Sequence, residues 1–546
     1  MRRMNKVIAI FFSFTLILSG CISTESKDGT ELPSSVNTGG LISENVNENI
    51  SENIDVNGSD TLSYEEIYNR NYPSYEEVQG EYPNKTVIMW SFDGTMWDTI
   101  ANTRTREVNA YLDAQGYDFV VCFDISSTGN SDEKYAYVNY IQEKIQNDEP
   151  VDIINYYGRY LIERRKESIA SYNAIVYAGL MEPLDKYFKT EEGQNLYNLM
   201  PDTFWESLKI DGKIYGFNSL FDNFSFDFGY YVNSGLAEKY GFDTEKSIAE
   251  QLDILQAVKN GEKDIDTVVL MSASNIDTAK NFGSLNEIAD GVYLENGEAH
   301  SVLDSDNYIE NLRLVNLLAT KLMLSYSYLE ETHKDNAFII MDNVKAGGSL
   351  YEGVDNVMID YFGNKIETIP VFKTNTIITE SASAVGICSA SKNKEKAFEL
   401  LTAIYTDPYL NNLLTYGVEG EDYTVEDGYI VLDSQHGNPV NQYRFSNKLI
   451  GFPTEGEPEN LTEFYTKAYN DVDDEYLGFA FDGRLLEDEI IAVGTVVRSF
   501  RVNFMLADDF DETLELMREK LEDAGIQKII DECNKQYQEW KAAQVT

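Results

Sequence analysis

Short apolar runs alternate with longer amphipathic stretches from about residue 86 onward, and this alternation limits the possible fold more than any other feature. Strands are predicted at 86–94, 117–124 and 151–154, and helices at 98–115 and 135–146. Strands that alternate with helices pair side by side in one sheet, and the helices cover its faces. The sequence therefore predicts an α/β fold built on a largely parallel sheet.

The carboxyl ends of two predicted strands carry aromatic and polar residues. Phe92 and Asp93 end the first strand, and Asn155, Tyr156 and Tyr157 follow the third. Ligands of open α/β sheets bind beyond these strand ends, so we expect the five residues to contact a ligand. Core packing is the alternative for each ring, because alternate strand residues point inward. Asp93 also precedes a glycine, a pairing typical of turns.

The amino terminus has the features of a bacterial export signal. Basic residues among the first six precede an apolar run at 7–17, which is too short to span a bilayer because a spanning helix needs about 20 apolar residues. The run leads into Leu-Ser-Gly-Cys at 18–21, which resembles a lipobox. We therefore expect residues 1–20 to be removed as a signal peptide and Cys21 to carry a lipid anchor.

Residues 21–82 are dominated by Ser, Asn, Glu, Thr and Gly. This composition buries too little apolar surface to offset chain entropy, so we expect a disordered linker behind the lipid anchor. Its tyrosine-rich end, at 64–82, is a candidate for packing on the folded body. The part from residue 83 onward exceeds the length of about 250–300 residues at which single cores stop growing, which indicates two lobes.

The charge and motif content exclude several functions. There are 93 acidic against 43 basic residues, a net charge of −50, which repels nucleic acid and anionic lipid heads. We therefore expect no nucleic-acid partner, and membrane contact through the lipid alone. The HExxH, P-loop, GxSxG and GxGxxG motifs are missing, and no CxxC pair occurs. We expect no catalytic residue, metal or cofactor, and we expect buried free thiols at Cys122 and Cys388.

Helix signals recur in the second half of the chain. An amphipathic helix is predicted at 392–405. The Asp-Pro pair at 407–408 then supplies an N-cap and a first-turn proline for another helix that ends near Gly417. The tail at 511–540 is predicted to form two helical segments separated by Gly525.

Four stretches of the chain occur in a characteristic order. They are IDGKIYGF at 210–217, GYYVNSGL at 229–236, the run from AVGIC at 384–388 to YGVEG at 416–420, and AGI at 524–526 followed by Gln536 and Trp540. In order and spacing they resemble family 1 extracellular solute-binding proteins, the group that includes maltose-binding protein. The large lipoproteins of Firmicutes involved in oligosaccharide uptake are the most similar subgroup. Asn218 stands where the family usually has proline.

The resemblance implies a two-lobe, periplasmic-binding-protein-like fold of type II, in which crossover hinge strands join lobes that close on a ligand. The expected approximate boundaries are 83–220 and 380–418 for lobe 1, and 221–379 and 419–546 for lobe 2. It also implies an extracellular receptor that captures a small ligand, which we expect to be an oligosaccharide. The receptor would deliver this ligand to the transmembrane subunits of an ABC permease.

Aromatic faces and carboxylates are the groups that bind neutral sugars, since a carboxylate accepts a charge-assisted bond from a hydroxyl. A third cluster near the expected first crossover therefore adds Phe221, Asp222 and Phe226 to the ligand-binding candidates. Weaker candidates are Trp205, Phe282, Tyr351 and Glu352.

Two other functions stay open at this point. A surface glycosidase would use two carboxylates, and such a pair is defined in space rather than by sequence spacing. A ligand sensor or adhesin would bind through the same lobes without a permease.

Overall fold

The computed structural model describes residues 73–92, 104–126, 136–157, 172–217, 224–225, 229–263, 265–270, 286–321, 324–326, 337–342, 368–372, 377–378, 383–432, 447, 449–453, 462–463, 466 and 475–544. The predicted signal peptide, Cys21 and most of the predicted linker lie outside these ranges. Within them, no helix combines the length and the apolar character that crossing a bilayer requires.

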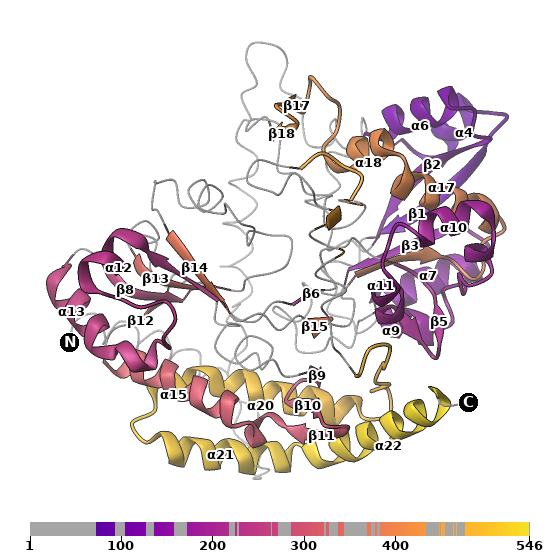
Figure 1. The fold of residues 1–546 in the computed structure, drawn as a ribbon. Coiled ribbons are helices and arrows are strands. Elements are labelled where there is room, and N and C mark those ends of the chain that lie inside the picture. The colour runs from indigo at the N-terminus through magenta and orange to yellow at the C-terminus, as the bar shows by residue number, and fades with distance from the viewer. Residues whose placement is uncertain are drawn as a thin grey trace, which may run out of the picture. The chain divides into compact units, whose positions relative to one another are not determined.

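Lobe 1 is organised by a four-stranded sheet with the strand order β16-β3-β1-β2. The central strand β1 (Thr86–Phe92) pairs in parallel with β2 (Phe119–Ile125) and β3 (Ile153–Tyr157). At one edge, β16 (Ser383–Ile387) pairs antiparallel with β3. The three predicted strands are thus confirmed in a largely parallel sheet, and a segment from far along the chain completes it (Figure 1).

Helices and short strands surround this sheet: α4 (Tyr75–Glu81), α6 (Thr105–Ala114), α7 (Ala136–Gln146), α9 (Tyr172–Tyr177), η3 (Tyr187–Lys189), α10 (Glu191–Tyr197), α11 (Asp202–Ser207), β4 (Lys209–Ile210), β5 (Lys213–Ile214), α17 (Lys394–Thr406), α18 (Pro408–Thr415), β17 (Tyr423–Glu426) and β18 (Tyr429–Leu432). The predicted helices are confirmed in α7 and α17. The described part of the predicted 98–115 helix begins only at Thr105.

The first helix lies inside the stretch predicted to be a linker. Helix α4 starts from a capping box, in which the Ser74 hydroxyl accepts from the Glu77 amide at 3.2 Å and the Glu77 carboxylate accepts from the Ser74 amide at 2.7 Å. Val78 is fully buried against β1 and β2, with Tyr75 and Tyr82 packed beside it. The ordered body therefore begins before residue 83, because this apolar face has a sheet to cover.

The end of lobe 1 also differs from the predicted boundary at 418. Tyr423 and Ile430 of the β17–β18 hairpin form a small core with Tyr416. Asp422 accepts two hydrogen bonds from the Arg104 guanidinium next to α6, at 2.7 and 3.2 Å. Residues just beyond 418 thus belong to lobe 1, since a half-buried ion pair and a shared core attach them there.

Lobe 2 contains a five-stranded mixed sheet with the order β12-β8-β13-β7-β14. Its strands are β7 (Gly229–Asn233), β8 (Asp266–Leu270), β12 (Leu324–Tyr326), β13 (Ala337–Asp342) and β14 (Thr368–Phe372). A three-stranded antiparallel sheet adds β9 (Asn286–Ala289), β10 (Val292–Glu295) and β11 (Glu298–Ser301).

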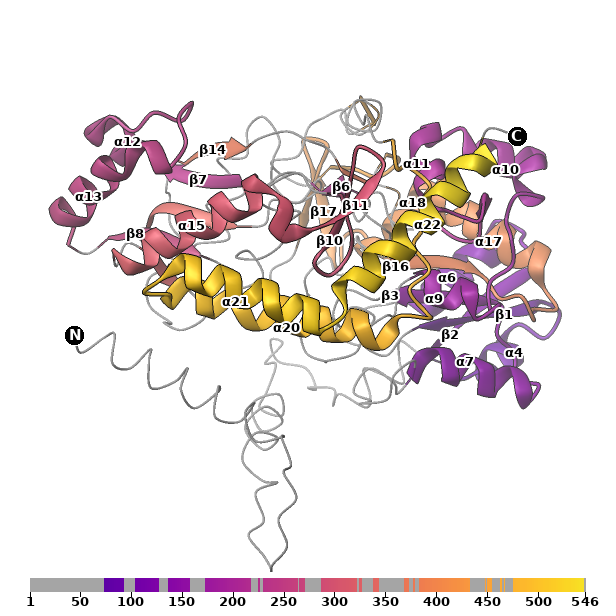
Figure 2. The same ribbon diagram turned by 90° about the horizontal axis from the view of Figure 1, so that it is seen from below.

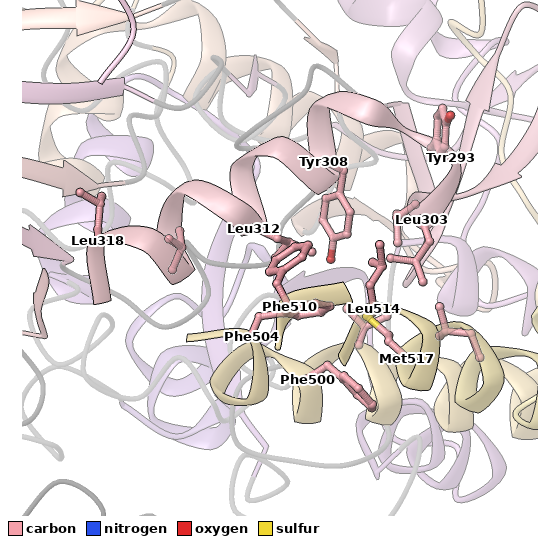
Figure 3. Packing of buried hydrophobic residues seen from close by; sticks show 14 of the residues in the cluster. Tyr293, Leu303, Tyr308, Leu312, Leu318, Phe500, Phe504, Phe510, Leu514 and Met517 are labelled. Carbon is pink, nitrogen blue, oxygen red and sulfur yellow. The ribbon is translucent and has the colours of Figure 1, made fainter. Parts of the chain in front are cut away.

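The helices of lobe 2 are α12 (Ser234–Tyr240), η4 (Ala249–Gln251), α13 (Leu252–Gly261), η6 (Val302–Asp304), α15 (Asp306–Thr320), α20 (Glu487–Leu506), α21 (Phe510–Asp523) and α22 (Ile526–Gln544). Figure 2 shows α20 and α21 side by side. Figure 3 shows how α15 meets them: Tyr308 and Leu312 pack toward Phe504, Phe510 and Leu514. This contact joins the carboxyl-terminal helices to the middle of the chain.

Two short strands lie on the connections between the lobes. Strand β6 (Phe224–Ser225) follows lobe 1 and pairs antiparallel with β15 (Ile377–Ile378), which precedes β16. The expected pair of crossover strands is thus present.

The predicted helix ends are confirmed in atomic detail. The Asp407 carboxylate caps α18 by accepting from the Tyr409 and Leu410 amides at 2.9 and 3.2 Å, and Pro408 is the first helical residue. Gly525 has φ +91°, the left-handed conformation that lets α21 stop before α22 begins.

Substitution of Gly386 in β16 tests how closely the backbone segments of lobe 1 are packed. A Cβ at this position would overlap the Tyr215 carbonyl oxygen, whereas a Cβ on Gly80 of α4 would meet nothing within 4 Å. We expect Gly386→Ala to lower the free energy of unfolding by about 1–3 kcal/mol, because the backbone must shift. Gly80→Ala should raise it by up to about 1 kcal/mol through helix propensity. Urea unfolding of both variants measures the difference, and equal effects would contradict the packing argument.

Candidate functional site

The carboxyl ends of the parallel strands β1, β2 and β3 lie at one edge of the lobe 1 sheet, beside residues of the antiparallel strand β16. Phe92 on β1 lies opposite Asn155 on β3, which in turn lies opposite Val385 on β16. These three residues therefore share one face of the sheet, because paired residues point the same way. Ser91 lies opposite Asp124 on β2, and these two share the other face.

Asn155 is the unusual member of this edge. Its side chain is 2% exposed, and its Nδ2 is buried without a hydrogen-bond partner among the described residues. A buried amide that makes no hydrogen bond costs about 1–3 kcal/mol of stability. A buried donor of this kind at a strand end keeps Asn155 among the candidates for ligand contact.

A second buried asparagine in the same lobe shows the ordinary arrangement. Asn109 of α6 is 1% exposed. Its Nδ2 donates to the Val121 carbonyl and its Oδ1 accepts from the Val121 amide, both at 2.8 Å. The Asn109 amide therefore fastens α6 to β2, whereas the Asn155 Nδ2 has no partner among the described residues.

Asp124 is a strand-end carboxylate that the sequence analysis did not select. It accepts from the Ser91 hydroxyl at 3.1 Å and from the Tyr140 hydroxyl at 2.9 Å, and Lys144 lies 3.2 Å away. The same strand-end argument that selected Asp93 would have found it. These donors from α7 and β1 occupy Asp124, so it braces the edge of the sheet.

Two of the predicted ligand contacts are core residues. Phe92 is fully buried, stacked on Trp90 with ring centroids 5.4 Å apart. Trp205 is also fully buried, stacked on Tyr197 at 5.1 Å, and its indole N–H donates to the Tyr197 carbonyl at 2.9 Å. Both rings are stacked on neighbouring rings inside the lobe 1 core, as the packing alternative predicts, and we do not include them in the site.

The remaining candidates divide into two groups. Tyr156 and Tyr157 form the last residues of β3, opposite Ala384 and Ser383 of β16. The other candidates lie outside the described residues: Asp93, Phe221, Asp222, Phe226, Phe282, Tyr351 and Glu352.

The opposite end of the sheet carries a structural carboxylate. Asp152, 2% exposed, accepts from the Met89 amide at 2.9 Å, the Ser391 hydroxyl at 2.5 Å and the Asn393 side chain at 3.2 Å. It ties the start of β3 to the turn between β16 and α17. The Ser-Lys-Asn run of the third recognised stretch thus serves to join these elements.

Nucleophile and metal chemistry find little support in the described part of the chain. Cys122, Cys388 and Cys533 are buried free thiols, as predicted for the first two. Burial raises the pKa of Cys122 and of Cys533 to about 12, which keeps both thiols protonated and unreactive at neutral pH. Within the described ranges, no cluster of three His, Cys, Asp or Glu residues is arranged to hold a metal ion.

The chain matches one family model and is similar in sequence to a named bacterial protein. Residues 475–542 match a domain of unknown function, DUF3502. A Streptococcus pneumoniae protein named carbohydrate ABC transporter substrate-binding protein is 26% identical over 387 residues, which cover 66% of this chain and 76% of that protein.

Two solved structures from Streptococcus pneumoniae share the fold. The N-glycan transport solute-binding protein NgtS has a TM-score of 0.63 at 18% identity, over 83% of this chain and 99% of that one. The ABC-transporter substrate-binding protein FusA in complex with kestose has a TM-score of 0.54 at 12% identity, over 84% and 100%. The predicted resemblance to solute-binding proteins is thereby confirmed, and the chain has their type II two-lobe fold.

The two buried asparagines should respond oppositely to the same substitution. We expect Asn155→Leu to leave the free energy of unfolding unchanged or to raise it, because it removes a buried Nδ2 that has no partner among the described residues. Asn109→Leu should lower it by about 2 kcal/mol or more, since both Val121 backbone groups lose their partners. Chemical denaturation of both variants measures the contrast. A comparable loss in Asn155→Leu would show that the Asn155 amide is held by the fold.

Proposed function

We propose that this protein is the extracellular receptor of an ABC importer and that it captures an oligosaccharide. The observation that carries the proposal is the match of 83% of the chain to nearly the whole of an N-glycan transport receptor. The relative named for carbohydrate transport supports the same function from sequence. Delivery to permease transmembrane subunits follows from this role.

The site chemistry agrees with a neutral ligand. The Asn155 Nδ2 can only donate, so it requires an acceptor such as a hydroxyl or ring oxygen. The chain's net charge of −50 disfavours an anionic guest. Tyr156 and Tyr157 follow Asn155 on the same strand, and tyrosine is a residue type whose ring can stack on a sugar.

The alternatives gain less support from the contacts. A glycosidase needs two carboxylates that can reach a substrate, and Asp124, the acid near the carboxyl end of β2 in the lobe 1 sheet, is engaged by Ser91, Tyr140 and Lys144. A sensor or adhesin would bind the same sugars. Co-purification with permease subunits separates an import receptor from that alternative.

Oligosaccharide binding can be measured directly. Titration calorimetry of residues 22–546 with N-glycans, fructans and milk oligosaccharides should show reversible, saturable binding of at least one class, with the glycan recovered intact. Asn155→Leu should weaken that binding by about 2–10-fold, the value of one hydrogen bond. Gly80→Ala, a change in the same lobe on α4, should not. Tight binding of a peptide or a metal ion with no response to any glycan would refute the sugar assignment.

We also propose that Cys21 carries the lipid that holds the receptor at the outer face of the cell membrane. The lipobox-like residues 18–21 support this assignment. Expressed in a bacterium that processes lipoproteins, the natural chain should fractionate with membranes. Cys21→Ser should lose metabolic labelling with a radioactive fatty acid, because the acceptor thiol is gone. Equal labelling of both forms would contradict the anchor at this position.

A further inference from the structure

The segment 476–486, which leads into α20, contributes side chains to the cores of both lobes. Tyr476, Phe479 and Phe481 pack into the core of lobe 2. Leu477 and Ala480 pack against the cores of lobe 1. The segment is therefore a third connection between the lobes, in addition to the β6–β15 pair, and it has one face for each lobe.

The lobe 2 face of the segment is firmly attached. The Asp482 amide donates to the Gln536 side chain of α22 at 2.8 Å, and the same side chain donates back to the Asp482 carbonyl at 3.0 Å. The Tyr476 hydroxyl accepts from the Gly297 amide at 2.9 Å. Phe479 lies edge-on to Tyr537 with ring centroids 5.4 Å apart. Hydrogen bonds and packed rings thus hold this face to lobe 2.

The lobe 1 face is attached mainly by one polar side chain. Besides Leu477 and Ala480 it offers Gly478, where a Cβ would lie 3.1 Å from the Glu206 carbonyl oxygen. The Arg484 guanidinium lies over the Tyr177 ring of α9, 4.3 Å from its centroid, and donates to the Tyr177 carbonyl at 3.5 Å. Apolar packing by Leu477 and Ala480 has no preferred direction, so the stacked and hydrogen-bonded cation is the directional contact on this face.

Asp482 orients that cation. Its two carboxylate oxygens accept from the Arg484 Nε and terminal nitrogen at 2.8 and 2.7 Å. The hydrogen bonds from Arg484 hold the pKa of Asp482 below its usual value, so the pair stays charged at neutral pH. A two-pronged bond of this kind fixes the plane of the guanidinium, which stacking on a ring requires.

Helix α9 links this contact to the first crossover. Tyr177 is its last residue and Tyr172 its first. The Tyr172 hydroxyl accepts from the amides of Tyr215 and Gly216 at 2.9 and 3.0 Å, just before the chain leaves lobe 1. A shift of α9 at Tyr177 is therefore transmitted to the backbone that enters the crossover.

From these contacts we infer that Arg484, oriented by Asp482 and stacked on Tyr177, is a latch that restricts the movement of lobe 1 against the 476–486 segment and lobe 2. An exposed cation–π contact changes a two-state population ratio by about 2–5-fold, enough to bias the lobes without locking them. The inference concerns lobe movement and does not depend on which ligand is bound.

The test compares Arg484 with Arg313, because each arginine stacks on an aromatic ring and pairs with an aspartate. Arg313 of α15 also lies 4.3 Å over a ring, that of Phe510, and pairs with Asp511 at 2.6 Å, but all three residues belong to lobe 2. Arg313 and Arg484 have equally exposed side chains, at 49% each. Spin labels at Glu143→Cys on α7 and Glu515→Cys on α21, both exposed helix positions, report the distance between the lobes by double electron–electron resonance.

Arg484→Ala and Tyr177→Leu should each broaden the distance distribution of the ligand-free protein, and the double variant should broaden it no further. Arg313→Ala should leave the distribution unchanged, although it removes the same kind of contact. An unchanged distribution in Arg484→Ala, or equal broadening in Arg313→Ala, would overturn the latch. Thermal unfolding of each variant confirms that the labelled protein is folded. Absence of sugar binding would refute the proposed function while leaving this result intact.

Discussion

The antiparallel pairing of β16 with β3 is the contact on which the architecture of lobe 1 depends. It joins residues 383–387 to residues 153–157 after the chain has passed through lobe 2. Gly386 makes the approach of the Tyr215 backbone possible, and α17 and α18 follow directly from β16. Because this pairing closes a loop of more than two hundred residues, lobe 1 is completed only after lobe 2 has been traversed, and the lobes are joined by several connections.

The buried polar groups of lobe 1 differ in how far their hydrogen bonds are satisfied inside the protein. Asp152 at the amino end and Asn109 on α6 satisfy their hydrogen bonds inside the protein and hold elements together. Asp124 is likewise occupied by neighbouring donors. Asn155 differs, because its buried Nδ2 has no partner in the described part of the chain. Under the proposed function, an Nδ2 in this state is preorganised, since it need not break a bond inside the protein before it donates to a ligand.

The connections between the lobes are unequal in kind. The β6–β15 pair is held by backbone hydrogen bonds, which require only local pairing. The 476–486 segment is held to lobe 2 by Gln536 and packed rings, and it meets lobe 1 through Leu477, Ala480 and Arg484. Attachment that is strong on one face and weak on the other lets a segment act as a moving part of one lobe. The ion pair between Arg104 and Asp422 holds the β17–β18 hairpin in lobe 1. The chain therefore crosses from lobe 1 to lobe 2 after this hairpin and before the 476–486 segment.

The sequence by itself determined the α/β class, the strands β1 to β3, the helix ends at Asp407 and Gly525, and the buried thiols, because each follows from local periodicity or capping chemistry. It also indicated Asn155, as a polar residue at a strand end. Only the tertiary structure decided that Phe92 and Trp205 are core, since the direction of a ring depends on what packs over its sheet face. Tertiary contacts likewise placed α4 and the β17–β18 hairpin in lobe 1, and brought Arg484 over Tyr177 across 307 positions of sequence. Contacts of that separation leave no periodic or capping signal in the chain, so no local pattern predicts them.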